Sequence, residues 1–236
     1  TLVFLGKGMD CLNPMFHRFI TGVAVLGLCL SPTVGFSLAL KKGKASEKGS
    51  ETYRPRAGDV LFQALPKGVD LVEAIEGVTR SNYSHCGVVL KGKDGSWKVF
   101  ESIGLVGAIP LKDWVSRGRG KKFSAFRLKK EHATELPKFK SALAKYSGRP
   151  YDLRYRMDDK FIYCSELVYK AYRDATGKPL GKLAKLGDLN WRPYLATIRK
   201  YEGGDPPLDR EMITPIDLSK APQLQKVFDN GMDEEP

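Results

Sequence analysis

The sequence predicts an α+β domain in which a small antiparallel sheet or barrel packs against helices. Two β-type runs, 85–90 and 97–103, flank a turn signal and indicate a hairpin. Residues 164–176 place apolar side chains at helical spacing and are followed by Gly177, a helix stop signal. The 236 residues suit a single core, because domains usually contain about 100 to 200 residues.

The remaining elements follow from the same patterns, taken in chain order. Further strands are predicted at 58–63 and 122–128. Further helices are predicted at 69–78 and 136–146, the second ended by Ser147-Gly-Arg-Pro150. Residues 187–236 are rich in Pro and Gly and show few periodic segments.

The N-terminal 39 residues are predicted to be a signal peptide. An uncharged, largely apolar run at 19–30 follows Arg18, and it is shorter than the roughly 20 residues that span a membrane. Small residues at 37 and 39 predict cleavage after Ala39. The protein would then be exported to the periplasm or the cell envelope.

Two other interpretations of this segment stay open. A lipoprotein anchored through Cys29 is disfavoured, because Leu28 stands where such a signal normally has a small residue. An uncleaved N-terminal anchor is disfavoured because Ser31-Pro32 interrupts the apolar run.

Composition sets the other domain boundaries. Residues 40–57 are rich in Lys, Gly, Ser and Glu and are predicted to be a flexible linker, so the domain is expected at 58–222. Residues 223–236, with their acidic end, are predicted to be a disordered tail.

The net charge of +12 is spread along the chain and suits anionic envelope polymers or lipid headgroups. No nucleic-acid motif accompanies it, and the oligomeric state is left open.

One cysteine has the setting of a nucleophile. Cys164 lies at the start of a predicted helix, where partial positive charge lowers the pKa of a thiol. A cysteine nucleophile also needs a nearby base that takes the proton of its thiol. Among the three histidines, His17 lies in the leader and His132 in a polar stretch, which leaves His85. The alternative is that Cys164 and His85 are both packed core residues without a catalytic role.

Signal-peptide removal would leave two of the four cysteines, Cys86 and Cys164. A disulfide between them is disfavoured, because Cys86 follows His85 in a strand and should face the opposite way. Cys164 would then stay free to react.

Four motifs together resemble a known family. Gly58-Asp-Val-Leu, Ser84-His-Cys-Gly-Val88, Val99-Phe-Glu101 and Tyr163-Cys-Ser-Glu-Leu-Val168 occur in this order. They are similar to those of the YiiX/YaeF-like permuted papain-like amidases, which belong with the NlpC-like cysteine peptidases. The resemblance implies a circularly permuted papain-like fold, with Cys164 as nucleophile, His85 as general base and Glu101 orienting the imidazole.

Strand parity tests the Glu101 role. An odd loop centred on Lys93, or a bulge at Gly95, places Glu101 on the face of His85, whereas a two-residue turn at Asp94-Gly95 separates them. We predict the odd loop or the bulge. Glu166 is a competing acid, but two residues beyond Cys164 it turns about 200° away on a helix.

An oxyanion needs hydrogen-bond donors. The backbone N–H of Cys164 is one candidate, and the side chains of Gln63 and Tyr163 are two others. Asp152, Asp158 and Asp159 lack accompanying metal ligands and are interpreted as loop acids. We expect no metal and no cofactor.

The predicted function is an exported cysteine hydrolase, an amidase or peptidase or an acyl-ester hydrolase. It would form a thioester on Cys164 with a peptide or lipid of the envelope as substrate. One alternative is an acyltransferase, because the permuted fold is similar to that of lecithin retinol acyltransferase. The other is a non-catalytic binding module.

Overall fold

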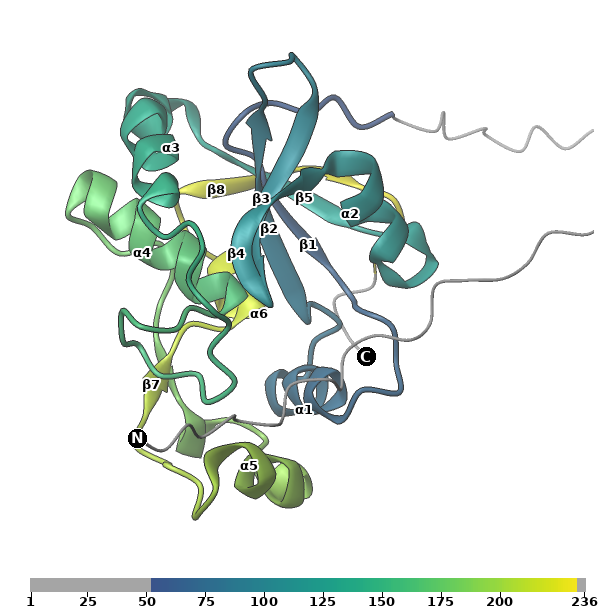
Figure 1. Cartoon of the computed structure of the whole chain (residues 1–236), viewed down its shortest axis with the longest axis vertical. Helices are drawn as coiled ribbons and strands as arrows, with labels where there is room; N and C mark the ends of the chain where they lie inside the picture. Colours follow the sequence, from purple (N-terminus) through teal and green to yellow (C-terminus); the bar gives the residue numbers. More distant parts are fainter. Residues whose placement is uncertain (1–51, 233–236) are drawn as a thin grey trace, which may run out of the picture. The chain divides into compact units, whose positions relative to one another are not determined.

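The structure is a computed structural model that describes residues 52–232, shown in Figure 1. The main strands are β1 (Val60–Gln63), β2 (His85–Lys91), β3 (Trp97–Ile103), β4 (Leu105–Pro110), β5 (Ser124–Leu128) and β8 (Leu224–Asp229). Two short strands are β6 (Ala184–Lys185) and β7 (Glu211–Met212). The helices are α1 (Asp70–Thr79), α2 (Leu111–Arg117), α3 (Leu136–Ala144), α4 (Cys164–Thr176), α5 (Leu195–Glu202) and α6 (Pro215–Ser219).

The six main strands form one open sheet in the order β4-β3-β2-β1-β5-β8. Every neighbouring pair in it is antiparallel. The fold is therefore α+β, as predicted, and of the two forms expected from the sequence it takes the sheet and not the barrel.

The two faces of the sheet carry different layers of side chains. Phe62, Cys86, Val88 and Phe100 belong to the larger core cluster, together with residues of α3 and α4. Leu61, Val89 and Val99 alternate with them and pack against Trp114 of α2. In Figure 1, α3 and α4 accordingly lie on one side of the sheet and α2 on the other.

Helix α4 buries most of its length in the core. Its residues from Cys164 to Tyr172 are all buried, and its apolar side chains follow the spacing that predicted it. Gly177 ends the helix with a φ of 73°, a left-handed conformation that glycine adopts without a steric penalty. Both predicted ends of this helix are confirmed.

Two predicted boundaries are wrong. The tail expected to be disordered contains β8, which pairs with β5 along the edge of the sheet and buries Leu224. At the other end, Tyr53 of the predicted linker packs its ring against Phe123 and Phe228. These segments show little periodicity, because each contributes only a few apolar side chains to a surface formed elsewhere.

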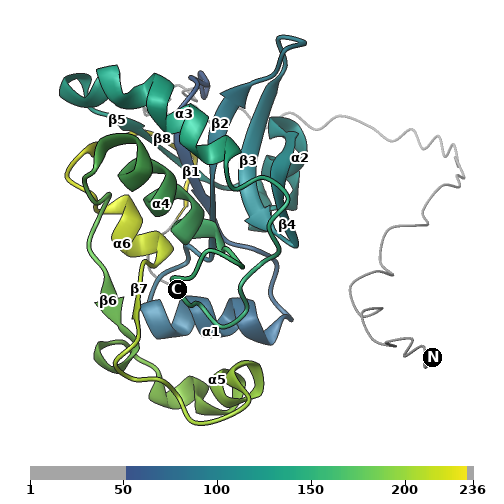
Figure 2. The same ribbon diagram turned by 60° about the vertical axis from the view of Figure 1, so that its left-hand side comes forward.

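A smaller layer lies beyond one end of the sheet. Figure 2 shows α1 and α5 there, close to the β6–β7 ribbon. Helix α1 packs closely on the turn before α5, and a Cβ atom at Gly77 would lie 1.7 Å from the Tyr194 hydroxyl. Helix α5, the α6 helix and both short strands were not predicted. Within residues 52–232, no helix is long and apolar enough to cross a membrane.

Candidate active site

The candidate site lies where strands β2 and β3 separate. Their pairing ends at Gly87 and Glu101, although both strands continue, while β2 remains paired with β1 as far as His85 opposite Gln63. The chain leading into α4 occupies the fork, and the Ser102 hydroxyl donates to the Ile162 carbonyl at 2.5 Å. This arrangement brings Cys164 to the open ends of both strands.

His85 and Glu101 meet on one face of the sheet. The imidazole Nε2 donates to the Glu101 carboxylate at 2.6 Å, and both side chains are buried. Lys91 pairs with Trp97, so five residues form the loop. The odd loop and the shared face are thus confirmed. The loop is centred on Asp94 instead of Lys93, however, so Glu101 lies opposite Gly87 and not opposite His85.

Gly87 provides the space for this contact. A Cβ atom at this position would lie 2.5 Å from Cγ1 of Val99 and 3.2 Å from the Cβ of Glu101. Such distances are shorter than packed carbon atoms tolerate. The glycine therefore lets the Glu101 side chain stand directly across the strand pair.

His85 also interacts with Cys164. Burial acts to lower the pKa of His85, but its bonds to Cys164 and Glu101 and their negative charge raise it to about 9. The pKa of the Cys164 thiol is held well below its usual range, first by a hydrogen bond from Cys86 and then, against burial, by His85. These directions favour a thiolate–imidazolium pair, the reactive form of a cysteine nucleophile.

Cys86 has the largest effect on the pKa of Cys164. The Cys86 side chain does face away from His85, but that face is the one that α4 covers. Interactions with the side chain and the backbone of Cys86 both lower the pKa of Cys164. Because Cys164 lies in the fork, close to the plane of the sheet, it meets side chains from both faces. Both cysteines are free thiols.

Arg117 is a site residue that the sequence analysis missed. Its guanidinium, at the end of α2, donates to the same carboxylate oxygen of Glu101 that accepts from His85, and it lies 3.5 Å from Nε2 of His85. Burial would raise the pKa of Glu101, but the bonds to His85 and Arg117 hold it below its usual range. Arg117 belongs to a basic run, and nothing local distinguishes it from its neighbours.

The two side chains that were predicted to donate to the oxyanion, Tyr163 and Gln63, have different environments. The Tyr163 hydroxyl accepts from the Ile213 N–H at 3.0 Å and donates to the Met157 sulfur at 3.1 Å. Its only proton is therefore already used. Gln63 is fully buried on the face of His85, and neither atom of its amide has a hydrogen-bond partner within residues 52–232. An oxyanion role for Gln63 stays a prediction.

The other acids have structural partners. Glu166 accepts from the Tyr163 N–H at 3.1 Å and pairs with Lys170 at 2.8 Å, and burial raises its pKa to about 8. Asp152 accepts the backbone N–H groups of Arg154 and Arg156, and Asp158 those of Lys160 and Phe161. Asp159 pairs with Lys170 at 2.9 Å.

Three comparisons relate the chain to known proteins. The family model described as "Permuted papain-like amidase enzyme, YaeF/YiiX, C92 family" matches residues 54–228. "Uncharacterized protein YiiX" of Escherichia coli strain K12 is 32% identical over 178 residues, which are 74% of this chain and 87% of the relative. The crystal structure of the metalloprotein yiiX, DUF1105, from Escherichia coli O157:H7 matches with a TM-score of 0.70 at 30% identity. The match covers 75% of this chain and 99% of that one.

The fold, with its histidine strand preceding its cysteine helix, defines a permuted papain-like protein of the cysteine hydrolase class. The chain belongs to the YaeF/YiiX permuted papain-like amidase family, C92. The related yiiX protein of known structure is called a metalloprotein. In the present chain, residues 52–232 do not bring together three His, Cys, Asp or Glu side chains that could hold a metal ion.

Proposed function

We propose that the protein is a cysteine hydrolase that transfers an acyl group to Cys164 and releases it to water. The observation that carries this proposal is the contact chain from the Cys164 thiol to His85 and on to Glu101. A thiol of lowered pKa, an imidazolium of raised pKa and a buried carboxylate are the three groups that thioester chemistry requires.

The groups act in sequence. The Cys164 thiolate attacks the carbonyl carbon of an amide or ester, and His85 donates its proton to the departing amine or alcohol. The thioester is then attacked by a water molecule from which His85 removes a proton. The N–H of Cys164, in the first turn of α4, has no partner within the helix and is placed to donate to the oxyanion. The unpaired amide of Gln63 is the candidate for a second donor.

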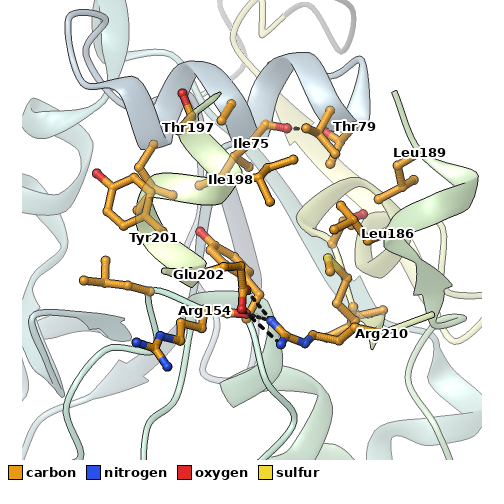
Figure 3. A pocket seen from close by; sticks show the side chains of 18 of the residues that line it. Ile75, Thr79, Arg154, Leu186, Leu189, Thr197, Ile198, Tyr201, Glu202 and Arg210 are labelled. Carbon is orange, nitrogen blue, oxygen red and sulfur yellow. Dashed lines mark hydrogen bonds and ion pairs between the residues drawn. The ribbon is translucent and has the colours of Figure 1, made fainter. Parts of the chain in front are cut away.

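An apolar pocket, whose lining does not include Cys164 or His85, is the candidate site for the acyl chain of a substrate. It lies between α1 and α5, and Figure 3 shows Ile75 and Ile198 on its wall, with Arg154 and the Glu202–Arg210 ion pair along one side. Tyr155 and Ile213 complete the lining. Most of its surface is apolar, as expected for a site that binds hydrocarbon.

The pocket is connected to the catalytic helix by direct contacts. The ring of Tyr155 lies 4.7 Å from that of Tyr163, measured between centroids. The Ile213 carbonyl accepts from the Ser165 hydroxyl at 2.8 Å, while its N–H donates to Tyr163. The pocket wall thus holds both neighbours of Cys164. Of the two predicted substrate classes, this favours a lipid acyl group over a peptide.

Acyl-enzyme trapping tests the proposal. The purified protein is mixed with p-nitrophenyl esters and fatty amides of increasing chain length, quenched in acid, and its peptides are weighed. We expect an acyl group on Cys164 in wild type, none in Cys164→Ser, and higher kcat/KM for longer chains up to the capacity of the pocket. Turnover that persists in Cys164→Ser would overturn the proposal.

The same assay separates hydrolysis from acyl transfer. With an added alcohol or amine acceptor, a hydrolase still releases mainly free acid, whereas an acyltransferase forms the acylated acceptor. A protein that binds acyl chains without forming the thioester would be the non-catalytic binding module.

We also propose that the chain is exported. The support is the apolar run at 19–30 in the sequence, which lies outside the described residues. Fractionation of the cells that make the protein, followed by N-terminal sequencing, tests it. The expected product lies in the envelope fraction and begins at Leu40. A chain retained in the cytoplasm with residues 19–30 intact would contradict the proposal.

A further inference from the structure

Exposed apolar side chains gather where the chain approaches the catalytic helix. Residues 52–232 contain six large apolar side chains that are exposed, and four of them lie on two neighbouring segments: Ile103, Leu105, Leu153 and Phe161. Leu105, at 64%, is the most exposed of the six. Single exposed apolar residues are ordinary, but a group of them marks a surface that binds a partner. We call the surface formed by these four residues the apolar rim.

The backbone joins the two segments of the apolar rim. One segment is the turn between β3 and β4, and the other is the loop at 149–163, which runs beside β4 and leads into α4 (Figure 2). Leu105 forms a β-bridge with Pro150. The Pro150 carbonyl in turn accepts from the N–H of Ile162, the neighbour of Phe161, at 2.9 Å. Leu105 and Phe161 are therefore held near one another by backbone pairing.

Cations surround these apolar side chains. The loop at 149–163 contributes four of them: Arg149, Arg154, Arg156 and Lys160. The Arg156 guanidinium lies 6.0 Å from the centroid of the Phe161 ring. Arg154 and Lys160 are exposed, and within residues 52–232 no ion pair involves either of them. The apolar rim therefore has free positive charge at its edge.

This charge favours a lipid surface over a second copy of the chain. Of the three acids in the loop, Asp152 is buried. Asp158 pairs with Arg156 at 3.5 Å, and Asp159 pairs with Lys170 at 2.9 Å. The acids are thus already neutralised. Two copies that met through this surface would bring like charges together, whereas the headgroups of an anionic bilayer attract them.

The apolar rim borders both parts of the proposed site. Leu153 is 48% exposed and also lines the apolar pocket, together with Arg154 and Tyr155. The loop ends at Tyr163, and Cys164 follows directly. An acyl chain that leaves a bilayer at this surface can therefore pass along Leu153 into the pocket.

We propose that the apolar rim docks the protein on an anionic lipid bilayer, from which the pocket takes the acyl chain of its substrate. The apolar side chains enter the boundary between headgroups and acyl chains, and the cations bind the phosphates. This inference rests on the proposed function and deepens it, because it names the source of the lipid substrate.

Vesicle binding by the full chain tests the docking. The protein is sedimented with vesicles of phosphatidylcholine alone, or of equal parts phosphatidylcholine and phosphatidylglycerol. We expect wild type to bind the anionic vesicles more tightly. The double variant Leu105→Ser/Phe161→Ser should lower the partition coefficient roughly tenfold, because two apolar side chains no longer insert. Lys160→Gln should lower it about fivefold, the contribution of one cation near an anionic surface.

Leu208→Ser is the matched control. Leu208 is 38% exposed, close to the 36% of Phe161, but it lies in the loop between α5 and β7. We expect its partition coefficient to equal that of wild type. Residues 1–51 are the same in every variant, so a difference between variants reports on the apolar rim. Hydrolysis of a soluble acetyl ester should be unchanged in the double variant and in the control, because none of the substituted residues lines the pocket.

Equal vesicle binding by wild type and the double variant would overturn the inference. So would a failure of wild type to bind either kind of vesicle. If the protein instead elutes as a dimer that the double variant converts to a monomer, the apolar rim joins two copies and does not dock on lipid.

The failure of the docking can be told from the failure of the proposed function. If soluble esters acylate Cys164 but the protein binds no vesicles, only the docking fails. If the protein binds vesicles through the apolar rim but Cys164 is never acylated, the docking surface remains and the hydrolase proposal fails.

Discussion

At the scale of single residues, Glu101 is the point where three side chains meet. Its carboxylate is almost fully buried and accepts from both His85 and Arg117 through one oxygen. A buried carboxylate stays ionised only when such partners compensate for the loss of water. Arg117 thus keeps Glu101 charged, and Glu101 in turn orients His85.

Replacing Arg117 should therefore weaken catalysis without removing the nucleophile. We expect Arg117→Ala to lower kcat/KM by roughly 10- to 100-fold, the equivalent of one hydrogen bond to a charged group. The acid limb of the pH profile should move to higher pH, because the pKa of Glu101 rises when its cation is lost. Arg117→Lys should restore part of the activity.

Arg119→Ala is the matched control, because Arg119 also pairs with a buried carboxylate, that of Glu76 at 2.8 Å. It should leave the shape of the pH profile unchanged. A wild-type profile in Arg117→Ala would show that Arg117 has no positioning role.

The raised pKa of His85 predicts the alkaline limit of activity. The imidazolium persists up to its folded-state pKa of about 9 and is lost above it. We therefore expect kcat/KM to hold through neutral pH and to decline near pH 9. The measurement is kcat/KM against pH under steady-state conditions. A decline already near pH 7, where an ordinary histidine deprotonates, would argue against the imidazolium.

At the scale of elements, the site is assembled by the packing of a helix against two strands that separate. Helix α4 begins at Cys164, and its first turn is held by Glu166, which caps the Tyr163 N–H, and by Ser165, which bonds to Ile213. The other end stops at Gly177. The helix can therefore be destabilised at its far end without touching the nucleophile.

Gly177→Ala tests that separation. At a φ of 73°, alanine should cost about 1 kcal/mol of unfolding free energy, measured by denaturant titration, while nothing within 4 Å obstructs the methyl group. Gly204→Ala is the control, because its surroundings are equally open and its φ is not in the left-handed region. We expect little change in the control and unchanged iodoacetamide labelling of Cys164 in both. Equal costs would contradict the role of Gly177 as a helix stop.

At the scale of the whole molecule, the substrate pocket is made by segments far apart in the sequence. Helix α1, helix α5 and the region around Met212 and Ile213 each supply part of the wall. Helices α1 and α5 pack together at one end of the sheet (Figure 2). The pocket is lined by residues of both helices. The preference for a particular acyl length is therefore a property of the assembled layers.

Filling the pocket should shorten the preferred acyl chain. Thr197 lines the pocket on α5, and we expect Thr197→Trp to lower kcat/KM for long-chain esters by roughly tenfold while sparing acetyl esters. The neighbouring Ala196 is exposed and does not line the pocket, so Ala196→Trp is the matched control. An equal loss for acetyl and long-chain esters in Thr197→Trp would show that the pocket does not hold the acyl chain.

The sequence by itself determined the elements that carry the candidate site. Helical spacing predicted the helix at 164–176, alternation predicted the hairpin from 85 to 103, and strand parity allowed His85 and Glu101 to share a face. These features depend on neighbours a few residues apart, which a single sequence contains. The motif order also predicted the family, which the comparisons confirm.

Only the tertiary structure decided which side chains meet at Cys164. Cys86 faces away from His85, as predicted, and the packing of α4 over that face of the sheet lets Cys86 lower the pKa of Cys164. In the sequence, Arg117 is one basic residue among several. It reaches Glu101 because Trp114 packs α2 against the face of the sheet opposite α4. Strand β8 and the apolar pocket likewise depend on surfaces formed by distant segments. Such contacts depend on how elements pack across the core, and local periodicity contains no information about that packing.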